Sequence, residues 1–399
     1  MKWEKVKLSE VTEYITDGDH QPAPKSDSGV LFVKIKDIQD NRLTFDNALF
    51  VPQEYYNRLP KNRKAEYGDT LYTVVGSYGI PAFVNHNIPF CFERNIALLH
   101  PNNRVIPKYL YYAVNNPIFY GNANNIANGS AQKLIPLSKL AGMEISVPPI
   151  ERQETIVNIL SAYDDLIENN QKQIKLLEEA AQRLYKEWFI DLRFPGHETT
   201  PIVDGIPEGW EVCKFSEIAS IMSGGTPKTE VKEYYEGDIP FYTPKDSDGS
   251  FFVFDTITHI SEAGLEHCNS QYYPEGTVII TARGTVGKTT ILAVPMAMNQ
   301  SCYALKCDEL NSPYYLFFSL NKEVDSLKTM ANGGVFNTII VKTFDSISLT
   351  IPTQKVLSAF NAVVSSIMQQ IKAKMKQNIH LAEARDRLLP KLMSGELEV

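Results

Sequence analysis

The 399-residue chain has few cysteines, no long hydrophobic run and no excess of positive charge. Its five cysteines are odd in number and never spaced C-x-x-C, which disfavours a disulfide framework and a structural zinc site. No stretch approaches the roughly 20 apolar residues that span a membrane, and Met1–Glu4 opens no signal peptide. The net charge of −8 argues against a basic, non-specific nucleic-acid coat. We therefore expect a cytoplasmic protein with no membrane partner and no metal site.

The most informative feature that is present is a long internal repeat. Trp3–Val11 reappears as Trp210–Ile218, and Gly76–Gly79 is matched by Gly284–Gly287. In the same order, Leu177 is matched by Leu381. A period of about 205 residues is too long for a solenoid, whose repeats run to about 50 residues, so the chain contains two copies of one whole module.

Each copy opens with a segment of mixed structure. Short runs of β-branched and aromatic residues lie between turn-forming residues, as at Val30–Ile35, Thr70–Val75, Thr277–Thr281 and Ser346–Ile351, and they predict strands. Pro107–Val114 predicts a helix. This part of each copy is therefore α+β.

Each copy closes with a segment of helical periodicity. No Gly or Pro occurs between Pro149 and Pro195, and seam residues there step by three and four; the same stepping returns from Thr353 to Leu389. Such a sustained heptad stripe predicts a long helix with a coiled-coil seam. The seam positions are Ile156, Leu160, Tyr163, Ile167, Asn170, Ile174, Leu177, Ala181, Leu184 and Trp188 in the first helix, and Val356, Phe360, Val363, Ile367, Gln370, Lys374, Gln377, Leu381, Ala384 and Leu388 in the second.

These helices could each lie on their own domain, or they could pair with each other. We favour pairing, because one narrow seam of this length exceeds what packing on a small domain needs. A helix of about 38 residues spans about 57 Å, and antiparallel pairing brings both ends of the second domain together. The expected fold class is α+β: two similar domains (residues 1–148 and 195–352) separated by a pair of long antiparallel helices (residues 149–194 and 353–399), with pseudo-two-fold symmetry.

Several short motifs recur in this arrangement. They are Val147–Gln153, Ile206–Glu211, Ser223–Pro227, Gly237–Phe241, Thr243–Asp246 and Gly284–Lys288, with Asp17–Pro22 and Lys34–Ile38 in the first copy. In this order and in duplicate they resemble the DNA specificity (S) subunit of type I restriction–modification systems, over essentially the whole chain. Two departures are Pro352-Thr353-Gln354, a shortened helix entry, and Gly76–Ile80, which lacks the lysine of its partner loop.

The resemblance implies a non-catalytic, sequence-specific subunit in which each domain recognises one part of a bipartite target in double-stranded DNA. Two methyltransferase (M) subunits would dock on the helices and methylate adenine, and motor-nuclease (R) subunits would join for cleavage. S-adenosylmethionine, ATP and Mg would belong to those partners, so this chain would bind no cofactor. The docking helices would carry Ile156, Leu160, Ile167, Ile174, Leu177, Leu184, Ile367, Leu381 and Leu388.

Base reading requires Arg, Lys, Asn or Gln at loop tips, because these side chains pair with guanine and adenine edges. Domain one offers Lys34, Lys36, Ser77, Tyr78, Arg94, Gln132 and Lys133, plus the basic cluster Arg58, Lys61, Arg63 and Lys64. Domain two offers Thr226, Lys228, Lys245, Arg283, Thr285, Lys288, Asn299, Gln300 and Asn337, of which the repeat-matched loops favour Arg283 and Lys288. Residues 195–352 carry 10 basic and 20 acidic side chains. We therefore expect basic residues focused on one face, with partner subunits supplying most contacts to the DNA backbone.

Three alternatives remain open. The chain could serve a stand-alone adenine methyltransferase without cleavage, or it could be a coiled-coil scaffold whose ends bind protein. Ala282–Thr289 also fits a loose P-loop pattern for nucleotide binding. The segment after it, Thr290–Pro295, favours a strand rather than the helix that a P-loop opens, so we disfavour that alternative.

Overall fold

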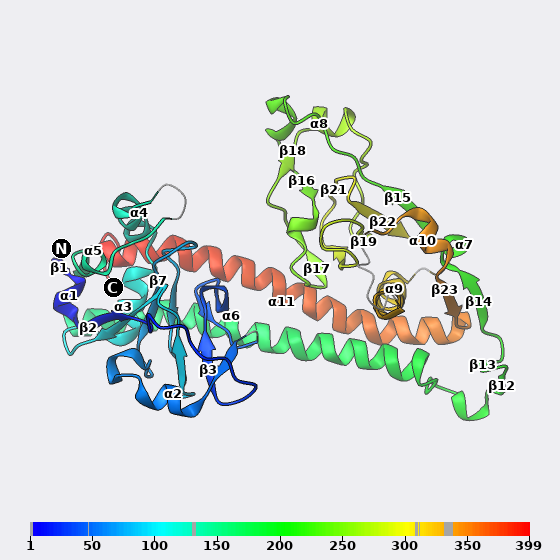
Figure 1. The fold of residues 1–399 in the computed structure, drawn as a ribbon. Helices are drawn as coiled ribbons and strands as arrows, with labels where there is room; N and C mark the ends of the chain where they lie inside the picture. Colours follow the sequence, from blue (N-terminus) through cyan, green and yellow to red (C-terminus); the bar gives the residue numbers. More distant parts are fainter. Residues whose placement is uncertain (1–2, 47, 130–132, 308–309, 311, 331–337) are drawn as a thin grey trace. The chain divides into compact units, whose positions relative to one another are not determined.

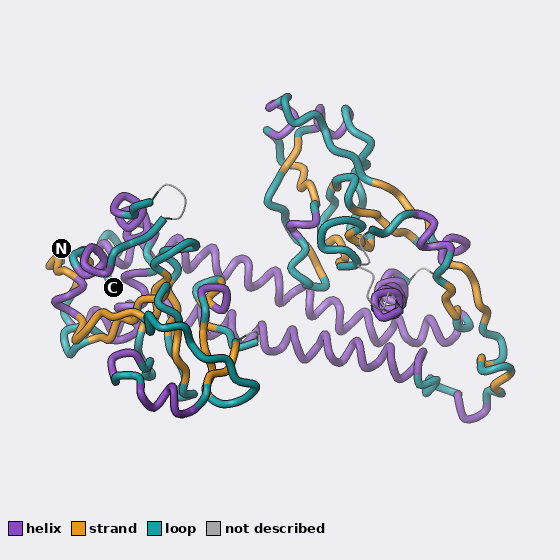
Figure 2. The backbone as a smooth tube through the Cα atoms, in the orientation of Figure 1, coloured by secondary structure: helices purple, strands orange, loops and turns teal. Residues whose placement is uncertain are grey.

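The computed structural model describes residues 3–46, 48–129, 133–307, 310, 312–330 and 338–399. By its internal contacts the chain divides into two units, each of mixed helix and strand structure (Figures 1 and 2). Unit 1 comprises Met1–Ile167 and His380–Val399, and unit 2 comprises Glu168–Ile379. Each of the two long helices, α6 (Ile150–Tyr185) and α11 (Gln354–Ser394), contributes one part to each unit.

Unit 1 is built on a four-stranded antiparallel sheet in the order β2-β10-β7-β8. A three-stranded sheet, β6-β3-β9, pairs β3 with β9 in parallel, and β1-β11 and β4-β5 form two-stranded sheets. The strands are β1 (Glu4–Lys7), β2 (Thr12–Asp17), β3 (Val30–Val33), β4 (Ile38–Gln39), β5 (Arg42–Leu43), β6 (Leu49–Val51), β7 (Thr70–Thr73), β8 (Pro81–Phe83), β9 (Phe90–Phe92), β10 (Ile96–Pro101) and β11 (Glu144–Val147).

Shorter α-helices complete the described part of unit 1. They are α1 (Leu8–Val11), α2 (Gln53–Arg58), α3 (Pro107–Val114), α4 (Pro117–Ile126) and α5 (Leu137–Ala141). A buried core joins the main sheet to Tyr109 of α3, Ile156 of α6 and Leu392 of α11. The α+β part of unit 1 is therefore seated on its segments of both long helices.

Unit 2 repeats this strand order in β15-β22-β19-β20 of its main sheet, where β17 is added in parallel beside β20. It also repeats the smaller sheets as β18-β16-β21 and β14-β23 and adds a hairpin, β12-β13. The strands are β12 (Ile202–Val203), β13 (Ile206–Pro207), β14 (Glu211–Lys214), β15 (Ser220–Ser223), β16 (Ile239–Tyr242), β17 (Phe252–Val253), β18 (His259–Ile260), β19 (Val278–Thr281), β20 (Thr289–Leu292), β21 (Ala297–Met298), β22 (Cys302–Lys306) and β23 (Ser348–Ile351). The shorter helices are α7 (Phe215–Ile218), α8 (Glu262–Glu266), α9 (Pro313–Met330) and α10 (Val341–Asp345).

Backbone hydrogen bonds also recur at repeat-matched positions. In unit 1 the amide of Thr73 donates to the carbonyl of Ile80 over 3.0 Å, and in unit 2 the amide of Thr281 donates to the carbonyl of Lys288 over 2.9 Å. Topology and hydrogen bonding together confirm that the chain is two copies of one module.

The long helices contact each other within unit 2. The side-chain amide of Asn170, which is 5% exposed, donates to Gln377 over 3.0 Å and to Asn378 over 2.9 Å. Further along α6, the ring of Tyr185 lies 6.5 Å from that of Phe360. Since the position on α11 falls as that on α6 rises, the helices run antiparallel in this unit.

A salt bridge joins the same helices within unit 1. Asp164 of α6 accepts a hydrogen bond from Arg385 of α11 over 2.8 Å and another from the Tyr112 hydroxyl of α3 over 2.5 Å. Asp164 thereby ties three helices together.

The expected seam of the second helix is correct at Val356 and Phe360, which are buried, but is wrong by one residue from Val363 to Gln370. Val363 is 46% exposed, whereas Val364 and Met368 are fully buried. The register shifts because this part of α11 packs against the α+β part of unit 2 as well as α6, which widens its buried face. The helix runs to Ser394, within the expected residues 353–399 and past the last predicted seam residue, because Leu392 and Met393 are buried in the core of unit 1. Among the helices described, none combines the length and apolarity needed to cross a bilayer.

Candidate nucleic-acid interface

The loop between β19 and β20 of unit 2 is closed by its own backbone. The carbonyl of Thr281 accepts from the amide of Gly287 over 2.8 Å, and the hydroxyl of Thr281 accepts from the amide of Lys288 over 2.9 Å. Both loop glycines have positive φ, which favours glycine at these turns. The loop leaves Arg283, Thr285 and Lys288 exposed. It connects two antiparallel strands, so no helix follows the P-loop-like sequence and the geometry of a nucleotide-binding P-loop is absent.

A second loop lies against this one. The hydroxyl of Thr285 donates to the carbonyl of Pro244 over 3.3 Å, which places the short 3-10 helix η6 (Pro244–Asp246) beside the β19–β20 loop. The carboxylate of Asp246 caps η6 by accepting from the amide of Thr243 over 2.8 Å. Lys245, between these two residues, is exposed.

Two further segments complete the cluster in unit 2. Gly224 lies so close to the chain after β21 that an added Cβ would be 2.3 Å from the carbonyl oxygen of Asn299. The hydroxyl of Thr226 donates to the side chain of Gln300, and the amide of Asn299 donates to the carbonyl of Tyr242 over 2.9 Å. Four segments therefore meet and bring together Thr226, Lys245, Arg283, Thr285, Lys288, Asn299 and Gln300. Lys228 is exposed, and among the described contacts none links its side chain to this cluster.

The same segments meet in unit 1. The carboxylate of Glu93 accepts from the amide of Ile35 over 2.7 Å, which joins the turn after β9 to the 3-10 helix η1 (Ile35–Asp37). The amide of Val74 donates to the carbonyl of Asn95 over 2.9 Å, so the loop after β7 lies beside that turn. The cluster gathers Lys34, Lys36, Ser77, Tyr78 and Arg94, of which Lys36 and Arg94 take the places of Lys245 and Gln300.

Lys133 joins the loop after β7 through residues that sequence reasoning missed. Its ammonium group lies 3.0 Å from Oδ1 of Asn124 and 5.9 Å from the centre of the Tyr78 ring. The Tyr78 hydroxyl donates to the same Oδ1, and the Tyr78 ring stacks on Tyr120 at 6.1 Å. Tyr120 and Asn124 are one turn apart on α4, and this spacing was the available signal. The expected contacts Gln132 and Asn337 lie outside the described residues.

The expected basic cluster of domain one is largely engaged within the chain. Arg63 lies 3.1 Å from the carboxylate of Asp19, and the Tyr55 hydroxyl donates to that carboxylate over 3.0 Å. Burial and this hydrogen bond raise the pKa of Tyr55. Lys61 pairs with Glu66 at 3.8 Å. Arg63 therefore serves to hold the loop after β2 and is a weak candidate for DNA contact.

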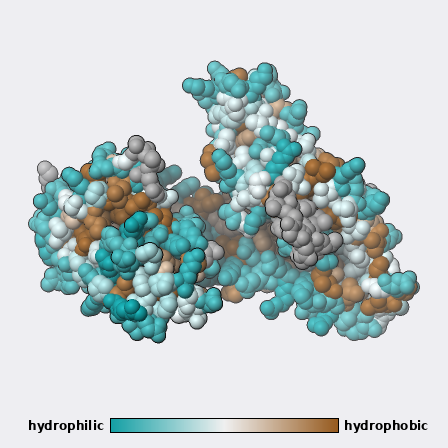
Figure 3. Space-filling view, viewed as in Figure 1, coloured by the Kyte–Doolittle hydropathy of each residue, from teal (hydrophilic) through white to brown (hydrophobic). Residues whose placement is uncertain are grey.

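Many of the acidic side chains of unit 2 lie in two groups. Four exposed glutamates, Glu233, Glu236, Glu262 and Glu266, lie on or beside α8 and the 3-10 helix η5 (Lys232–Tyr235), where Figure 3 shows a mainly hydrophilic surface. Glu178, Asp246, Asp248 and Asp255 line a pocket of about 740 Å³, where burial raises the pKa of Glu178. Asp246 is the neighbour of exposed Lys245 in the loop cluster, whereas the four glutamates lie on or beside α8 and η5.

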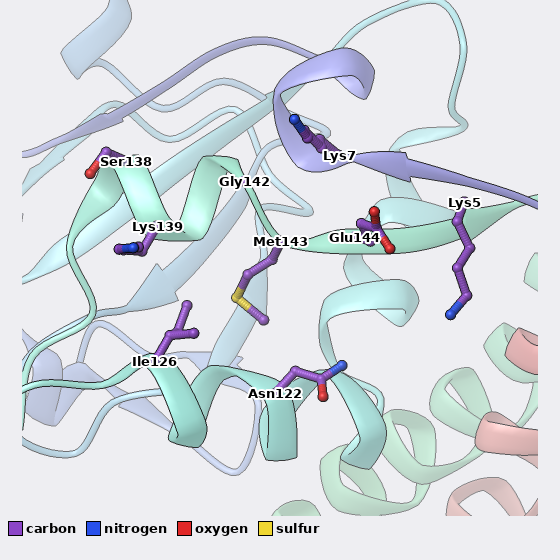
Figure 4. A pocket seen from close by; sticks show the side chains of 9 residues that line it. All are labelled: Lys5, Lys7, Asn122, Ile126, Ser138, Lys139, Gly142, Met143 and Glu144. Carbon is purple, nitrogen blue, oxygen red and sulfur yellow. The ribbon is translucent and has the colours of Figure 1, made fainter.

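Unit 1 has a pocket of about 540 Å³ between α4, α5 and the β1-β11 sheet (Figure 4). Lys5 and Lys7 come from β1, Lys139 from α5 and Glu144 from β11, and Met143 points toward α4. The lining is basic and amphipathic and does not pair a nucleophile with a general base. Within the described part of the chain, no group of three or more His, Cys, Asp or Glu side chains is placed to hold a metal ion.

The helix residues that were expected to dock partner subunits are buried or partly buried by other parts of this chain. Ile156, Leu160 and Ile167 are buried, and Ile174, Leu177, Leu184, Ile367, Leu381 and Leu388 are partly buried. Their side chains therefore build the two units. The exposed large apolar residues of these helices are different ones: Ile150, Leu166 and Leu176 on α6, and Val363 and Ile379 on α11.

Comparison with known proteins identifies the family. Residues 1–179 and 207–378 match the type I restriction modification DNA specificity domain. The chain is 31% identical to the type I restriction enzyme MjaIX specificity subunit of Methanocaldococcus jannaschii, over 78% of this chain and 74% of the relative. It is 23% identical to the HindI specificity subunit of Haemophilus influenzae, over 92% and 94%. The type I S subunit of M. genitalium has a similar fold, with a TM-score of 0.59, 16% identity and coverage of 98% and 96%.

The chain therefore belongs to the family of type I restriction–modification DNA specificity subunits. Subunits of this family are non-catalytic, and the catalytic activity belongs to partner subunits.

Proposed function

We propose that this chain recognises a bipartite DNA target, with the loop cluster of each unit reading one half. The observation that carries the proposal is the duplicated cluster: the same backbone hydrogen bonds hold loops whose side chains differ, exposed Arg94 against exposed Gln300 and partly buried Tyr78 against partly buried Val286. Phosphate contacts position a protein on DNA, whereas contacts to base edges specify sequence. Two scaffolds with different exposed side chains suit two different half-sites.

The long helices form an antiparallel coiled coil that sets the gap between the half-sites. Asn170 with Gln377 and Asn378, and Asp164 with Arg385, support this arrangement, since each pair joins α6 to α11. One turn of B-DNA is about 34 Å, so a rod of about 57 Å can present two domains to successive major grooves.

The partners are two methyltransferase subunits and, for cleavage, motor-nuclease subunits, which would bring S-adenosylmethionine, ATP and Mg. We place the methyltransferases on the outward apolar residues Leu166, Leu176, Val363 and Ile379, because exposed apolar side chains on helices favour helix docking. The partners would also supply contacts to the DNA backbone, in keeping with the acidic charge of residues 195–352. Such an assembly acts in the cytoplasm.

The test is to map methylated adenines in DNA exposed to the assembled complex. The expected result is one split motif, with Arg283→Ala weakening recognition of one half by about 1–3 kcal/mol if Arg283 reads a base. The matched control is Lys232→Ala, because Lys232 is exposed in the same unit, on η5, and is not a base-reading candidate. A continuous motif, or equal losses on both halves, would contradict the proposal.

The spacer role needs its own experiment. One heptad is inserted in each helix, between Ile167 and Glu168 and between Ile379 and His380, which adds about 10 Å to the rod. The gap should lengthen by about three base pairs while both half-motifs stay the same. An unchanged gap would count against the spacer.

A further inference from the structure

The loop tip of unit 1 is held in one arrangement by packing around Gly79. Gly79 has φ of +85°, and an added Cβ would lie 2.6 Å from the ring of Tyr120, so the loop and α4 are in close contact. Tyr120 stacks on Tyr78, whose hydroxyl reaches Asn124 one turn further along α4. Lys133 is fixed to the same loop, because its carbonyl accepts from the amide of Gly76 over 3.1 Å.

The orientation of the Asn124 amide follows from its partners. Lys133 carries only donors, so the Asn124 atom 3.0 Å from it must be the oxygen Oδ1. The Tyr78 hydroxyl donates to that same oxygen. A carbonyl oxygen has two lone pairs, and both are therefore occupied.

Asn124 and Lys133 consequently present donors at this tip. Asn124 is exposed and presents the two N–H groups of Nδ2, and exposed Lys133 presents the N–H groups that Asn124 does not accept. An asparagine normally reads adenine by accepting from N6–H with its oxygen while donating to N7. Asn124 cannot use that mode, because its oxygen already accepts from Tyr78 and Lys133.

We infer that Asn124 and Lys133 read a guanine in the half-site of unit 1. In the major groove guanine presents two adjacent acceptors, O6 and N7, whereas adenine and cytosine present an amino donor and thymine presents O4 beside a methyl group. Only guanine offers two adjacent acceptors to this pair of donors. The inference rests on the proposed function, and it adds a residue and a base identity to it.

The experiment measures binding of the assembled complex to its mapped target by fluorescence anisotropy. Guanines of the unit 1 half-site are replaced one at a time by 7-deazaguanine, which lacks the N7 acceptor, and in parallel by inosine, which keeps O6 and N7. At one position 7-deazaguanine should raise the Kd of the wild-type complex about 5- to 100-fold, and inosine should have little effect. Asn124→Asp should bind the natural target weakly and be insensitive to 7-deazaguanine. Asp keeps the acceptor for Tyr78 and Lys133 but replaces the donating Nδ2 with an acceptor.

The matched control is Asn125→Ala, since Asn125 is exposed on the same helix. It should retain the wild-type sensitivity to 7-deazaguanine. Equal weakening of Asn124→Asp on all sequences would mean a backbone contact and would overturn the inference, as would a half-site with no position sensitive to 7-deazaguanine. A wild-type complex that bound no split target would instead refute the proposed function.

Discussion

Asp164 offers the sharpest test of how unit 1 is held on the long helices. Its side chain is 20% exposed, that of Arg385 is 16% exposed, and the Tyr112 residue that donates to Asp164 is 1% exposed. Replacing Asp164 with Ala removes the acceptor for both donors. Burial and the Asp164 carboxylate raise the pKa of Tyr112, so its hydroxyl remains a neutral donor that Asp164→Ala would leave unpaired.

The expected loss of stability can be estimated from these contacts. A hydrogen bond to a charged group contributes about 1.5–3 kcal/mol, and breaking a buried ion pair costs about 3–5 kcal/mol. Arg385 keeps Asp386 as a partner at 2.8 Å, which reduces the second cost. We therefore expect Asp164→Ala to destabilise unit 1 by about 3 kcal/mol. At a urea m-value of about 3 kcal/mol/M, the midpoint falls by about 1 M.

The assay is urea-dependent hydrogen exchange, followed by mass spectrometry on peptides of α3 so that the opening of unit 1 is observed separately. The matched control is Asp386→Ala, because Asp386 is 59% exposed and exposed pairs contribute about 0.2–1 kcal/mol. If Asp164→Ala cost no more than Asp386→Ala, the role of Asp164 in joining α3, α6 and α11 would be wrong.

Three further predictions concern single positions. Gly224→Ala should weaken binding to the unit 2 half-site only, because its Cβ would meet the Asn299 carbonyl oxygen at 2.3 Å; equal losses on both half-sites in the anisotropy assay would contradict this. Gly121→Ala should stabilise unit 1 by about 0.5–1 kcal/mol in thermal unfolding, because an added Cβ on this residue of α4 meets nothing within 4 Å. Burial raises the pKa of Cys91 to about 12 and also raises that of Cys302, so both should react with a thiol reagent at pH 8 only after denaturation. Their reaction at the rate of half-buried Cys268 would contradict the structure.

The sequence predicted the features that depend on periodicity and repetition. The duplication, the two long helices and the helix Pro107–Val114 follow from patterns within the chain, and the structure has α3 at those bounds. The sequence predicts a strand over Thr70–Val75, but the observed strand β7 ends at Thr73. The reason is that the amides of Val74 and Gly76 donate to loop carbonyls and not to a neighbouring strand. Strand propensity does not show where the backbone stops bonding to a neighbouring strand and bonds to loop residues instead.

Features that depend on tertiary packing were missed. Heptad stepping alone placed Val363 in the seam, and only the added contact with the α+β part of unit 2 selects Val364 instead. Asn124 and Tyr120 carry no motif of their own, and their role follows from the loop of Tyr78 folding against α4. Conversely, Arg63 looked available in the sequence but pairs with Asp19, far from it in the chain.

The shared threonines explain how one scaffold can carry two different tips. In unit 1 the Thr73 hydroxyl accepts from the amide of Ile80 over 2.9 Å, and in unit 2 the Thr281 hydroxyl accepts from the amide of Lys288 over 2.9 Å. In both units the base of the loop is closed by backbone groups and one threonine, so the side chains of Ile80 and Lys288 take no part in these hydrogen bonds. Ile80 and Lys288 can therefore differ without cost to the fold. If the exposed side chains read DNA as we propose, sequence changes at the tips should alter the half-site while the repeated backbone contacts keep the module intact.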